Sequence, residues 1–430
     1  MDDTAPRRLS RRKLLVGGGL AAAGTVMLRP ADRSGPRADY FLRLQGALKA
    51  AGLAQPCLVI DRQRLDANAA LLARSLPGGM GYRIVVKSLP SARLIERVRA
   101  ATGTDRLMTF NLPMLRHFAA AMPDARQFLG KPLPAAAVQT LLARPGGLAA
   151  DALDRITFLL DTPERLSQYA ALARSAGRGI ACAIEIDVGL HRGGQEPGAG
   201  LDAMLHAFKA APELRFAGMM GYEPHVPKVP EFLGMRARSL AHAWDSYRAA
   251  QDQTRAVLGA EALAGAVLNA AGSPTFRLYK DTSVANEVSV GSALVKPTDF
   301  DTPLLEPFQP ASFIAAPVLK RTATRLPHGF DAVTAIQRAW DPNTRETLFI
   351  YGGHWLARPV DPPGLQYNDL FGRSSNQEML NAGAGLSAGV DDFVFLRPHQ
   401  SEAVFLQFGD IAIYDGENIA EFWPVLPASA

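Results

Sequence analysis

The residue whose setting points most directly to chemistry is a lysine at the end of an apolar run. Lys87 closes the run Tyr82-Arg83-Ile84-Val85-Val86-Lys87 and is followed by a serine. A lysine amine that loses its proton by desolvation becomes a nucleophile towards aldehydes. By its position alone, Lys87 could equally be an ordinary surface lysine at the end of a strand. The neighbouring motifs have to distinguish the two roles.

Two further segments carry side chains that suit such a site. Arg192 lies among glycines in the segment Glu185-Ile186-Asp187-Val188-Gly189-Leu190-His191-Arg192-Gly193-Gly194, where a salt bridge to Asp187 is its alternative role. Tyr222 and His225 directly follow another apolar run, 216–221. A neutral imidazole titrates in the range that proton transfer requires, although a histidine at a strand end is often structural.

A third segment could bind an anion. Ala271-Gly272-Ser273-Pro274-Thr275 follows the apolar run 266–269. Backbone N–H groups and hydroxyls in such a loop can hold phosphate oxygens, which makes Gly272, Ser273 and Thr275 candidates. An ordinary turn is the competing interpretation, because Pro274 has no N–H to donate.

The elements that must position these groups alternate between short apolar runs and helical patterns. This alternation predicts parallel strands and an α/β fold, a (β/α)8 barrel over residues 38–285. A doubly wound sheet is less favoured, since no G-x-G-x-x-G follows the first run. A barrel would gather the strand ends on one face, where barrel enzymes hold their active sites. The expected strands are 57–60, 82–86, 106–110, 156–160, 180–188, 216–221 and 266–269.

The chain changes texture after about residue 286. Pro and Gly become frequent, and strand-like runs recur at short spacing. We expect residues 286–430 to form an antiparallel β domain. Its expected strands are 312–319, 347–351, 392–396, 403–408 and 411–414.

The amino terminus has the pattern of an export signal. Arg11 and Arg12 precede a weakly apolar run, 14–28, which is typical of the twin-arginine route. The run is short of the roughly 20 apolar residues that span a bilayer. We expect residues 1–31 to be a signal read by the twin-arginine translocase, giving a periplasmic protein, with an uncleaved tether as the alternative.

Charge and cysteine content exclude two classes of protein. The formal net charge is +5, but the first thirty residues hold six Lys/Arg against two Asp, which is +4 and leaves about +1 for the rest. A nearly neutral body offers no general attraction to nucleic acid. Cys57 and Cys182 both lie in apolar runs, so we expect buried free thiols and no disulfide framework.

Together these segments resemble the fold-type III pyridoxal-phosphate enzymes, in the branch that contains D-threonine aldolase and metal-dependent D-serine dehydratase. The similarity runs from residue 56 to the end and is densest in the barrel half. Pro56-Cys57-Leu58-Val59-Ile60-Asp61 resembles the family's first strand, and Val86-Lys87-Ser88 resembles its Schiff-base lysine segment. The segments 185–194 and 216–225 resemble the branch's other motifs, in the same order and spacing.

The resemblance implies an alanine-racemase-like barrel that binds pyridoxal 5′-phosphate and acts on a small amino acid, with a homodimer as one candidate assembly. Lys87 would hold the cofactor, and Arg192 would face its ring as a weaker partner than a carboxylate. The loop residues Gly272, Ser273 and Thr275 would bind the phosphate. Tyr222 and His225 would line the substrate pocket, where the histidine could take the proton of a β-hydroxyl group.

The resemblance weakens at the metal site. The branch binds a divalent metal through a histidine followed two positions later by cysteine or aspartate, but this chain reads Pro398-His399-Gln400-Ser401-Glu402. Ser401 is a poor ligand, and on a strand Glu402 would point to the opposite face. His399 and Glu402 are therefore the remaining candidate ligands. His354 is a further departure from the family pattern and could supply the missing ligand instead. We expect a lost or altered metal site.

That departure ranks the candidate reactions. A metal ion polarises the β-oxygen of a substrate, so loss of hydroxide becomes difficult without one. Retro-aldol cleavage requires only deprotonation of the β-hydroxyl group. We therefore expect a lyase of D-3-hydroxyamino acids, similar to D-threonine aldolase, with a Schiff base on Lys87. The alternatives are a D-serine dehydratase-like enzyme, an amino-acid racemase, and a pyridoxal-phosphate-binding protein without turnover.

Overall fold

The computed structural model describes residues 29–143, 148, 151–368, 370 and 372–427. These residues divide into two compact units. Of the described residues, the larger unit contains those within 57–314, 356–358 and 397–427, and the smaller contains those within 29–56, 315–355 and 359–396. Residues 1–28, which form most of the expected export signal, lie outside the described part of the chain.

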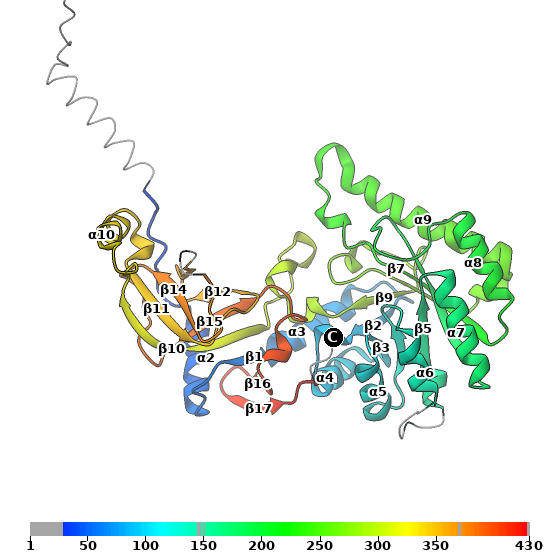
Figure 1. Ribbon diagram of the computed structural model, residues 1–430, viewed down its shortest axis with the longest axis horizontal. Helices are drawn as coiled ribbons and strands as arrows, with labels where there is room; N and C mark the ends of the chain where they lie inside the picture. The colour runs from blue at the N-terminus through cyan, green and yellow to red at the C-terminus, as the bar shows by residue number, and fades with distance from the viewer. Residues whose placement is uncertain (1–28, 144–147, 149–150, 369, 371, 428–430) are drawn as a thin grey trace, which may run out of the picture. The chain divides into compact units, whose positions relative to one another are not determined.

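A closed barrel of parallel strands forms the larger unit, which confirms the predicted (β/α)8 fold (Figure 1). Strands such as β5 and β6 are almost continuously apolar and buried, as expected where helices cover one face of a sheet and a packed core the other. The ring runs, in order, through β2 (Gly81–Val85), β3 (Arg106–Thr109), β4 (Arg126–Leu129), β5 (Ile156–Leu160), β6 (Ile180–Ile186), β7 (Leu214–Gly221), β8 (Val267–Ala270) and β9 (Glu287–Val290).

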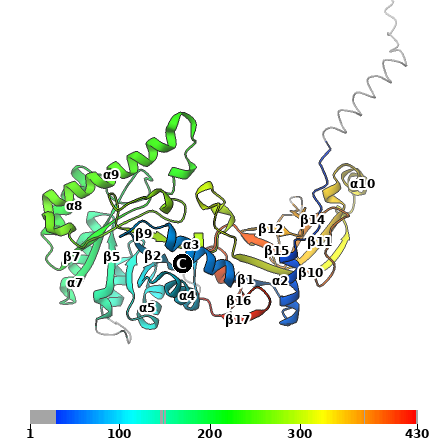
Figure 2. The ribbon, with the colours of Figure 1, turned by 180° about the vertical axis from the view of Figure 1, so that it is seen from behind.

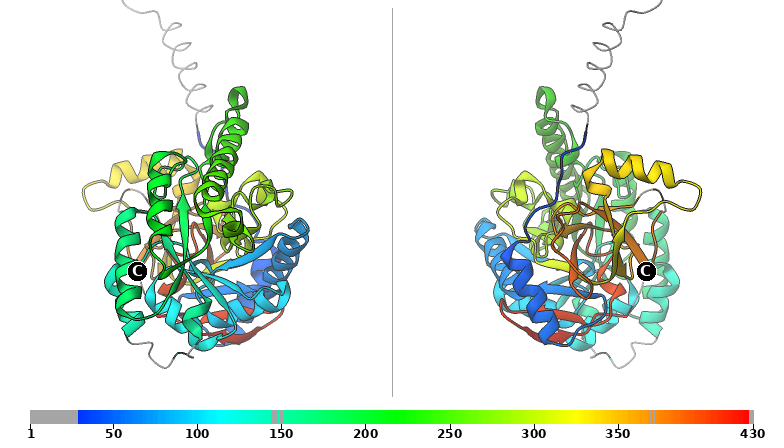
Figure 3. Two further views of the ribbon diagram at one scale, coloured as in Figure 1. Left: turned by 90° about the vertical axis from the view of Figure 1, so that its right-hand side faces the viewer. Right: turned by 90° about the vertical axis from the view of Figure 1, so that its left-hand side faces the viewer.

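Helices surround this barrel (Figure 2), and most of their buried residues are apolar. Thr162 caps one of them as its sequence predicts, because its side chain accepts a hydrogen bond from the N–H of Arg165. None of the described helices is long and apolar enough to cross a membrane. Figure 3 shows the longest, α9, reaching past its neighbours. The helices are α3 (Arg62–Ser75), α4 (Ala92–Thr102), α5 (Leu112–Ala121), α6 (Ala135–Ala143), α7 (Pro163–Ser175), α8 (Ala199–Lys209) and α9 (Met235–Leu258).

The first apolar strand is not part of the barrel, contrary to our expectation. β1 (Cys57–Asp61) instead pairs in parallel with β16 (Ile411–Tyr414), which pairs antiparallel with β17 (Ile419–Trp423). All five residues of β1 are buried. An apolar run such as 57–60 indicates cover on both faces, but it does not indicate which sheet the strand joins.

Two strands that the sequence patterns did not indicate complete the ring. β4 contains Arg126 and Gln127, and β9 contains Glu287 and Ser289. Polar side chains interrupt both runs, so neither has the apolar pattern of a barrel strand. Because β9 closes the barrel, the ring extends beyond residue 285, where we expected it to end.

The smaller unit is built on a separate sheet, in which β10 pairs antiparallel with β11 and β11 with β14. A buried ion pair, Arg37 to Asp361 at 2.6 Å, fixes the segment that precedes α2. One expected strand, 403–408, is wrong: it contains a short 3-10 turn, Phe405–Gln407, and belongs to the larger unit. The elements are α2 (Asp39–Ala50), β10 (Ser312–Ala323), α10 (Asp331–Trp340), β11 (Glu346–Tyr351), β12 (Ala357–Asp361), β13 (Gln366–Tyr367), β14 (Gln377–Ala382) and β15 (Phe393–Pro398).

Both cysteines are buried and free, as their apolar runs predicted. Burial raises the pKa of the Cys57 thiol to about 12, and it raises that of Cys182 still further. Neither thiol is therefore ionised at neutral pH, and both act as small apolar side chains.

Candidate active site

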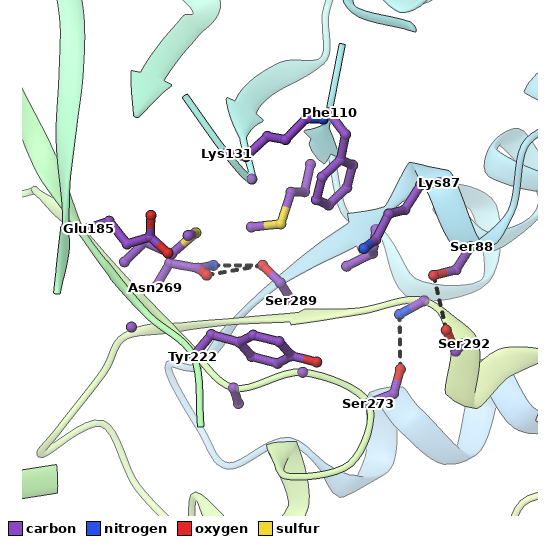
Figure 4. Close-up of a pocket in the computed structure, with 18 of the residues that line it drawn as sticks. Lys87, Ser88, Phe110, Lys131, Glu185, Tyr222, Asn269, Ser273, Ser289 and Ser292 are labelled. Atoms are coloured by element: carbon purple, nitrogen blue, oxygen red, sulfur yellow. Dashed lines mark hydrogen bonds between the residues drawn. The ribbon is translucent and has the colours of Figure 1, made fainter. Parts of the chain in front are cut away.

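A cavity of about 420 Å³ lies at the carboxyl ends of the barrel strands (Figure 4). Its walls include residues one or two positions after the strands: Lys87 after β2, Lys131 after β4, Asp161 after β5, Tyr222 after β7 and Ser292 after β9. This is the face on which barrel enzymes build their active sites. The barrel therefore brings together residues that are far apart in the sequence.

Lys87 projects into this cavity from a short 3-10 turn, Val86–Ser88, that follows β2. Its Nζ atom lies 4.6 Å from the centre of the Phe110 ring. Crowding by protein atoms desolvates the amine and lowers the pKa of Lys87, and the cations Arg192 and Lys131 act in the same direction. The carboxylate of Glu402 opposes them. A lysine held in this way is closer to its nucleophilic form than a surface lysine.

Arg192 and Tyr222 also line the cavity. The guanidinium carbon lies 5.4 Å from the centre of the tyrosine ring, a cation–π arrangement. Asp187 pairs with His191 at 3.1 Å, so the alternative salt bridge to Arg192 is absent from the described residues. Burial raises the pKa of Tyr222 to about 12, which keeps its hydroxyl protonated at neutral pH.

The expected phosphate loop follows β8, and Gly272 and Ser273 line the cavity. The Ser273 hydroxyl accepts the backbone N–H groups of Gly291 and Ala293 at 3.3 and 3.0 Å. Thr275 is fully buried, and its Oγ1 atom accepts the N–H of Gly272 at 3.2 Å, so it shapes the loop from behind.

His225 does not line the cavity, although it follows β7 as predicted. A Cβ atom on Gly189 would lie 3.6 Å from His225 Nε2 and 3.1 Å from His242 Cδ2, so the two rings approach each other across this glycine. Desolvation lowers the pKa of His225, against the attraction of Asp187. Its buried Nδ1 atom has no hydrogen-bond partner among the described residues.

Glu402 enters the cavity wall, where three serine hydroxyls surround it. Ser88 donates to Glu402 Oε1 at 2.6 Å, and Ser292 Oγ lies 3.3 Å from the same oxygen. Ser401 is fully buried and donates to Oε2 at 3.2 Å. Serine hydroxyls therefore hold both carboxylate oxygens, and Figure 4 shows Ser88 and Ser292 beside Lys87.

The two candidate metal ligands have different partners. His399 Nδ1 lies 2.5 Å from the hydroxyl of Thr298, whereas Glu402 bonds the serines. His354 belongs to the smaller unit, where its backbone N–H donates to Glu378.

Within the described part of the chain, one group of three side chains is close enough to hold a metal: Asp187, His191 and Glu196. His191 and Glu196 are 70% and 68% exposed, and Asp187 Oδ1 accepts the N–H groups of Gly189 and His191. These contacts of Asp187 close an exposed turn, and that turn is sufficient to explain why the three side chains lie together.

Several cavity residues were not predicted individually. Glu185 lies within the motif that contains Arg192, and burial raises its pKa to about 7, with Arg192 opposing the shift. Asn269 and Ser289 are buried on β8 and β9, where Asn269 Nδ2 donates to Ser289 at 2.8 Å. The period-two spacing of Glu287 and Ser289 could have indicated that both face the barrel interior. No signal in the sequence marks Ser292, because β9 itself was not recognised.

Comparison with known proteins agrees with this architecture. The family described as alanine racemase, N-terminal domain, matches residues 60–299, which is more than half of the 430 residues. No curated protein matches the sequence.

Three solved structures show the same fold at low sequence identity. A D-threonine aldolase from Filomicrobium marinum matches with a TM-score of 0.68 at 21% identity, over 87% of this chain and 95% of that chain. A D-threo-3-hydroxyaspartate dehydratase from Delftia sp. HT23 gives 0.67 at 18% identity, over 88% and 98%. An alanine racemase from Bacillus anthracis gives 0.64 at 12% identity, over 86% and 97%. The chain belongs to the alanine racemase N-terminal domain family of fold-type III pyridoxal-phosphate enzymes, as its motifs predicted.

Proposed function

We propose that this protein is a pyridoxal-phosphate-dependent lyase that cleaves the Cα–Cβ bond of D-3-hydroxyamino acids, with Lys87 holding the cofactor. The observation that carries the proposal is the placement of Lys87. It reaches from the end of a barrel strand into the cavity, and desolvation lowers its pKa. Such an amine is suited to bond an aldehyde.

The cavity residues fit this cofactor. The backbone N–H groups of Ser273 and Ser292 bond no other described residue, so both are free to donate to phosphate oxygens. Gly272 and Gly291 leave room beside them: a Cβ atom would lie 2.5 Å from the Tyr222 ring at Gly272, and 2.7 Å from Val85 O at Gly291. When bound, the cofactor would supply a sink for the electron pair released at Cα.

Two side chains of the wall would tune this environment. Arg192 keeps its proton at any working pH, so it can attract negative charge in the cavity but cannot donate a proton. Glu185 can hold or release a proton near neutral pH, because its pKa is about 7. The tyrosine ring that packs against Arg192 gives the cavity a flat apolar side.

The choice of reaction rests on the donor set near Lys87. A divalent metal needs at least two firm protein ligands, and the position that would supply the second is Ser401, which is buried and bonded to Glu402. The residues present do not fit the family's metal pair. Cleavage of the Cα–Cβ bond requires only a base for the β-hydroxyl group, whereas dehydration requires a departing hydroxide to be stabilised. The names of the aldolase and dehydratase structures support a D-3-hydroxyamino acid as substrate.

The test begins with the purified protein and its cofactor. Borohydride reduction should fix the cofactor on a peptide that contains Lys87, and Lys87→Ala should abolish this labelling. Lys131→Ala is the matched control, because Lys131 lines the same cavity. The loaded protein should then release an aldehyde and glycine from D-threonine or a related D-3-hydroxyamino acid. Keto-acid formation would identify a dehydratase, inversion of alanine a racemase, and no turnover a binding protein.

A further inference from the structure

The cluster around Glu402 is a built part of the cavity wall. Ser88 and Ser292 are 1% and 4% exposed, and their hydroxyl oxygens lie 3.0 Å apart. Both meet Glu402 Oε1, while the fully buried Ser401 bonds Oε2. An ionised carboxylate offers about four acceptor sites, so at least one remains open after three hydroxyls have bonded. That open site belongs to a residue that lines the cavity.

A hydrogen bond to the residue next to Lys87 fixes the position of the Glu402 carboxylate relative to the lysine. Ser88 directly follows Lys87, so the hydrogen bond from Ser88 ties Glu402 to the turn that carries the amine. The charge of Glu402 accordingly acts on Lys87 and on Tyr222. A substrate whose amino group took the place of the Lys87 amine on the cofactor would therefore lie beside the carboxylate of Glu402.

Three other candidates for this proton are less suited to a hydroxyl near Lys87. Tyr222 stays protonated at neutral pH, since its pKa is about 12. Glu185 projects from the far side of the cavity, across from Lys87 (Figure 4). His225, which the motifs suggested for this role, does not line the cavity.

We propose that Glu402 is the general base that accepts the β-hydroxyl proton of the substrate, in the region where the family's metal pair is incomplete. The proposal rests on the proposed lyase function. Ser88, Ser292 and Ser401 are positioning residues that hold the carboxylate.

The step balances without a metal or any added reactant. Glu402 takes the proton from the β-oxygen, and the O–H electron pair becomes the second bond of the new aldehyde carbonyl. The Cα–Cβ bond breaks at the same time, and its pair passes to Cα, where a bound cofactor would supply the sink for it. Glu402 then gives up its proton through solvent and Cα receives one, which yields glycine and restores the carboxylate.

The experiment compares Glu402→Gln and Glu402→Ala with Glu417→Gln, a matched control on an exposed residue of the same C-terminal segment. Aldehyde release from D-threonine is measured with and without a strong chelator. Both Glu402 variants should lose about a hundredfold or more in kcat. Formate should restore part of the activity of Glu402→Ala, because it can enter the vacated space as a small carboxylate base. The control and the chelated wild-type protein should keep their rates within about twofold.

A second measurement requires no turnover. D-2-aminobutyrate lacks only the β-hydroxyl group of threonine, and its dissociation constant can be read from the absorbance of the bound cofactor. If Glu402 serves the hydroxyl group, this constant should be the same in wild type and in both Glu402 variants. A role in shaping the cavity would weaken this ligand as much as it slows turnover.

The outcomes separate the two proposals. A wild-type protein that releases no aldehyde from any D-3-hydroxyamino acid overturns the lyase function, and the role of Glu402 with it. A wild-type protein that cleaves its substrate while Glu402→Gln keeps more than about a third of kcat overturns the role of Glu402 alone. Loss of wild-type activity on chelation, or weaker D-2-aminobutyrate binding in the variants, also contradicts it.

Discussion

Gly272 lies in the loop after β8 that we expect to bind the phosphate, and it lines the cavity. A Cβ atom at this position would lie 2.5 Å from Tyr222 Cε2, a distance that no side chain tolerates. Gly272→Ala should therefore displace the tyrosine ring and weaken pyridoxal-phosphate binding by at least about tenfold, as a misplaced wall does in other sites. The measurement is a titration of the apoprotein with cofactor, followed by absorbance.

The control for this substitution is Gly46→Ala. Gly46 lies inside helix α2, and a Cβ atom there would meet nothing within 4 Å. Alanine should leave cofactor affinity unchanged and should slightly stabilise that helix. Equal affinities for Gly272→Ala and wild type would show that the loop does not limit the cofactor site.

Glu185 gives a prediction about pH. Burial raises its pKa from 4.5 to about 7, so the folded protein keeps this proton longer than the unfolded chain does. The folded state therefore loses stability as pH rises from 4.5 towards 7, and the full cost is present above 7. Glu185→Gln removes this cost. The variant should gain about 1–2 kcal/mol more over wild type at high pH than at low pH, a range that allows for solvent in the cavity.

Denaturant unfolding of the cofactor-free protein at pH 5 and pH 8 measures this difference. Glu196→Gln is a suitable control, because that side chain is 68% exposed. A gain of the same size at both pH values would mean that Glu185 titrates normally in the folded protein. The ionised residue would then act in the cavity as a fixed negative charge.

At the scale of elements, one buried carboxylate ties the first strands of the barrel to the last. Glu287 on β9 is fully buried and accepts from Arg83 on β2 at 2.6 Å and from Arg106 on β3 at 2.8 Å. Burial opposes its ionisation, but the attraction of the two arginines outweighs burial and lowers the pKa of Glu287. Glu287→Ala should cost about 3–5 kcal/mol of unfolding free energy, because it leaves cations unpaired inside the barrel.

A double variant distinguishes the loss of the ion pair from the loss of packing. Arg83→Met combined with Glu287→Leu removes the principal charges together, and it should recover part of the stability that Glu287→Ala loses. Asp245→Ala, which breaks the exposed pair with Arg248 at 2.7 Å, should change stability by less than about 1 kcal/mol. If Glu287→Ala were as mild as this control, the barrel would not depend on the cluster for closure.

At the scale of the whole molecule, we propose export to the periplasm by the twin-arginine route, on the evidence of the paired arginines ahead of the apolar run 14–28. This route carries folded proteins, which would fit a protein that folds around its cofactor in the cytoplasm first. Changing Arg11 and Arg12 together to Lys should leave the protein in the cytoplasm, as cell fractionation would show. Arg7 and Arg8 changed in the same way are the control, and periplasmic protein in both cases would refute the signal.

The sequence by itself determined the type of fold, and it predicted a site centred on Lys87. Repeated apolar runs and amphipathic segments require parallel strands covered by helices, because each must bury its apolar side. The motifs around Lys87, Arg192 and Tyr222 were sufficient to predict one shared site, since strand ends converge in a barrel. The order of motifs along the chain carried this information.

Only the tertiary structure decided which strands close the ring and which side chains complete the site. β1 is apolar as far as Asp61 yet pairs outside the barrel, whereas β9, which contains Glu287 and Ser289, closes it. Only the folded barrel brings Glu287 to its arginines. Glu402 comes 314 residues after Ser88, and no local pattern indicates that the two side chains touch. The periodicity of apolar residues along the sequence indicates which side chains are buried. Which distant segments touch depends instead on the register of the strands and on where the connecting turns end.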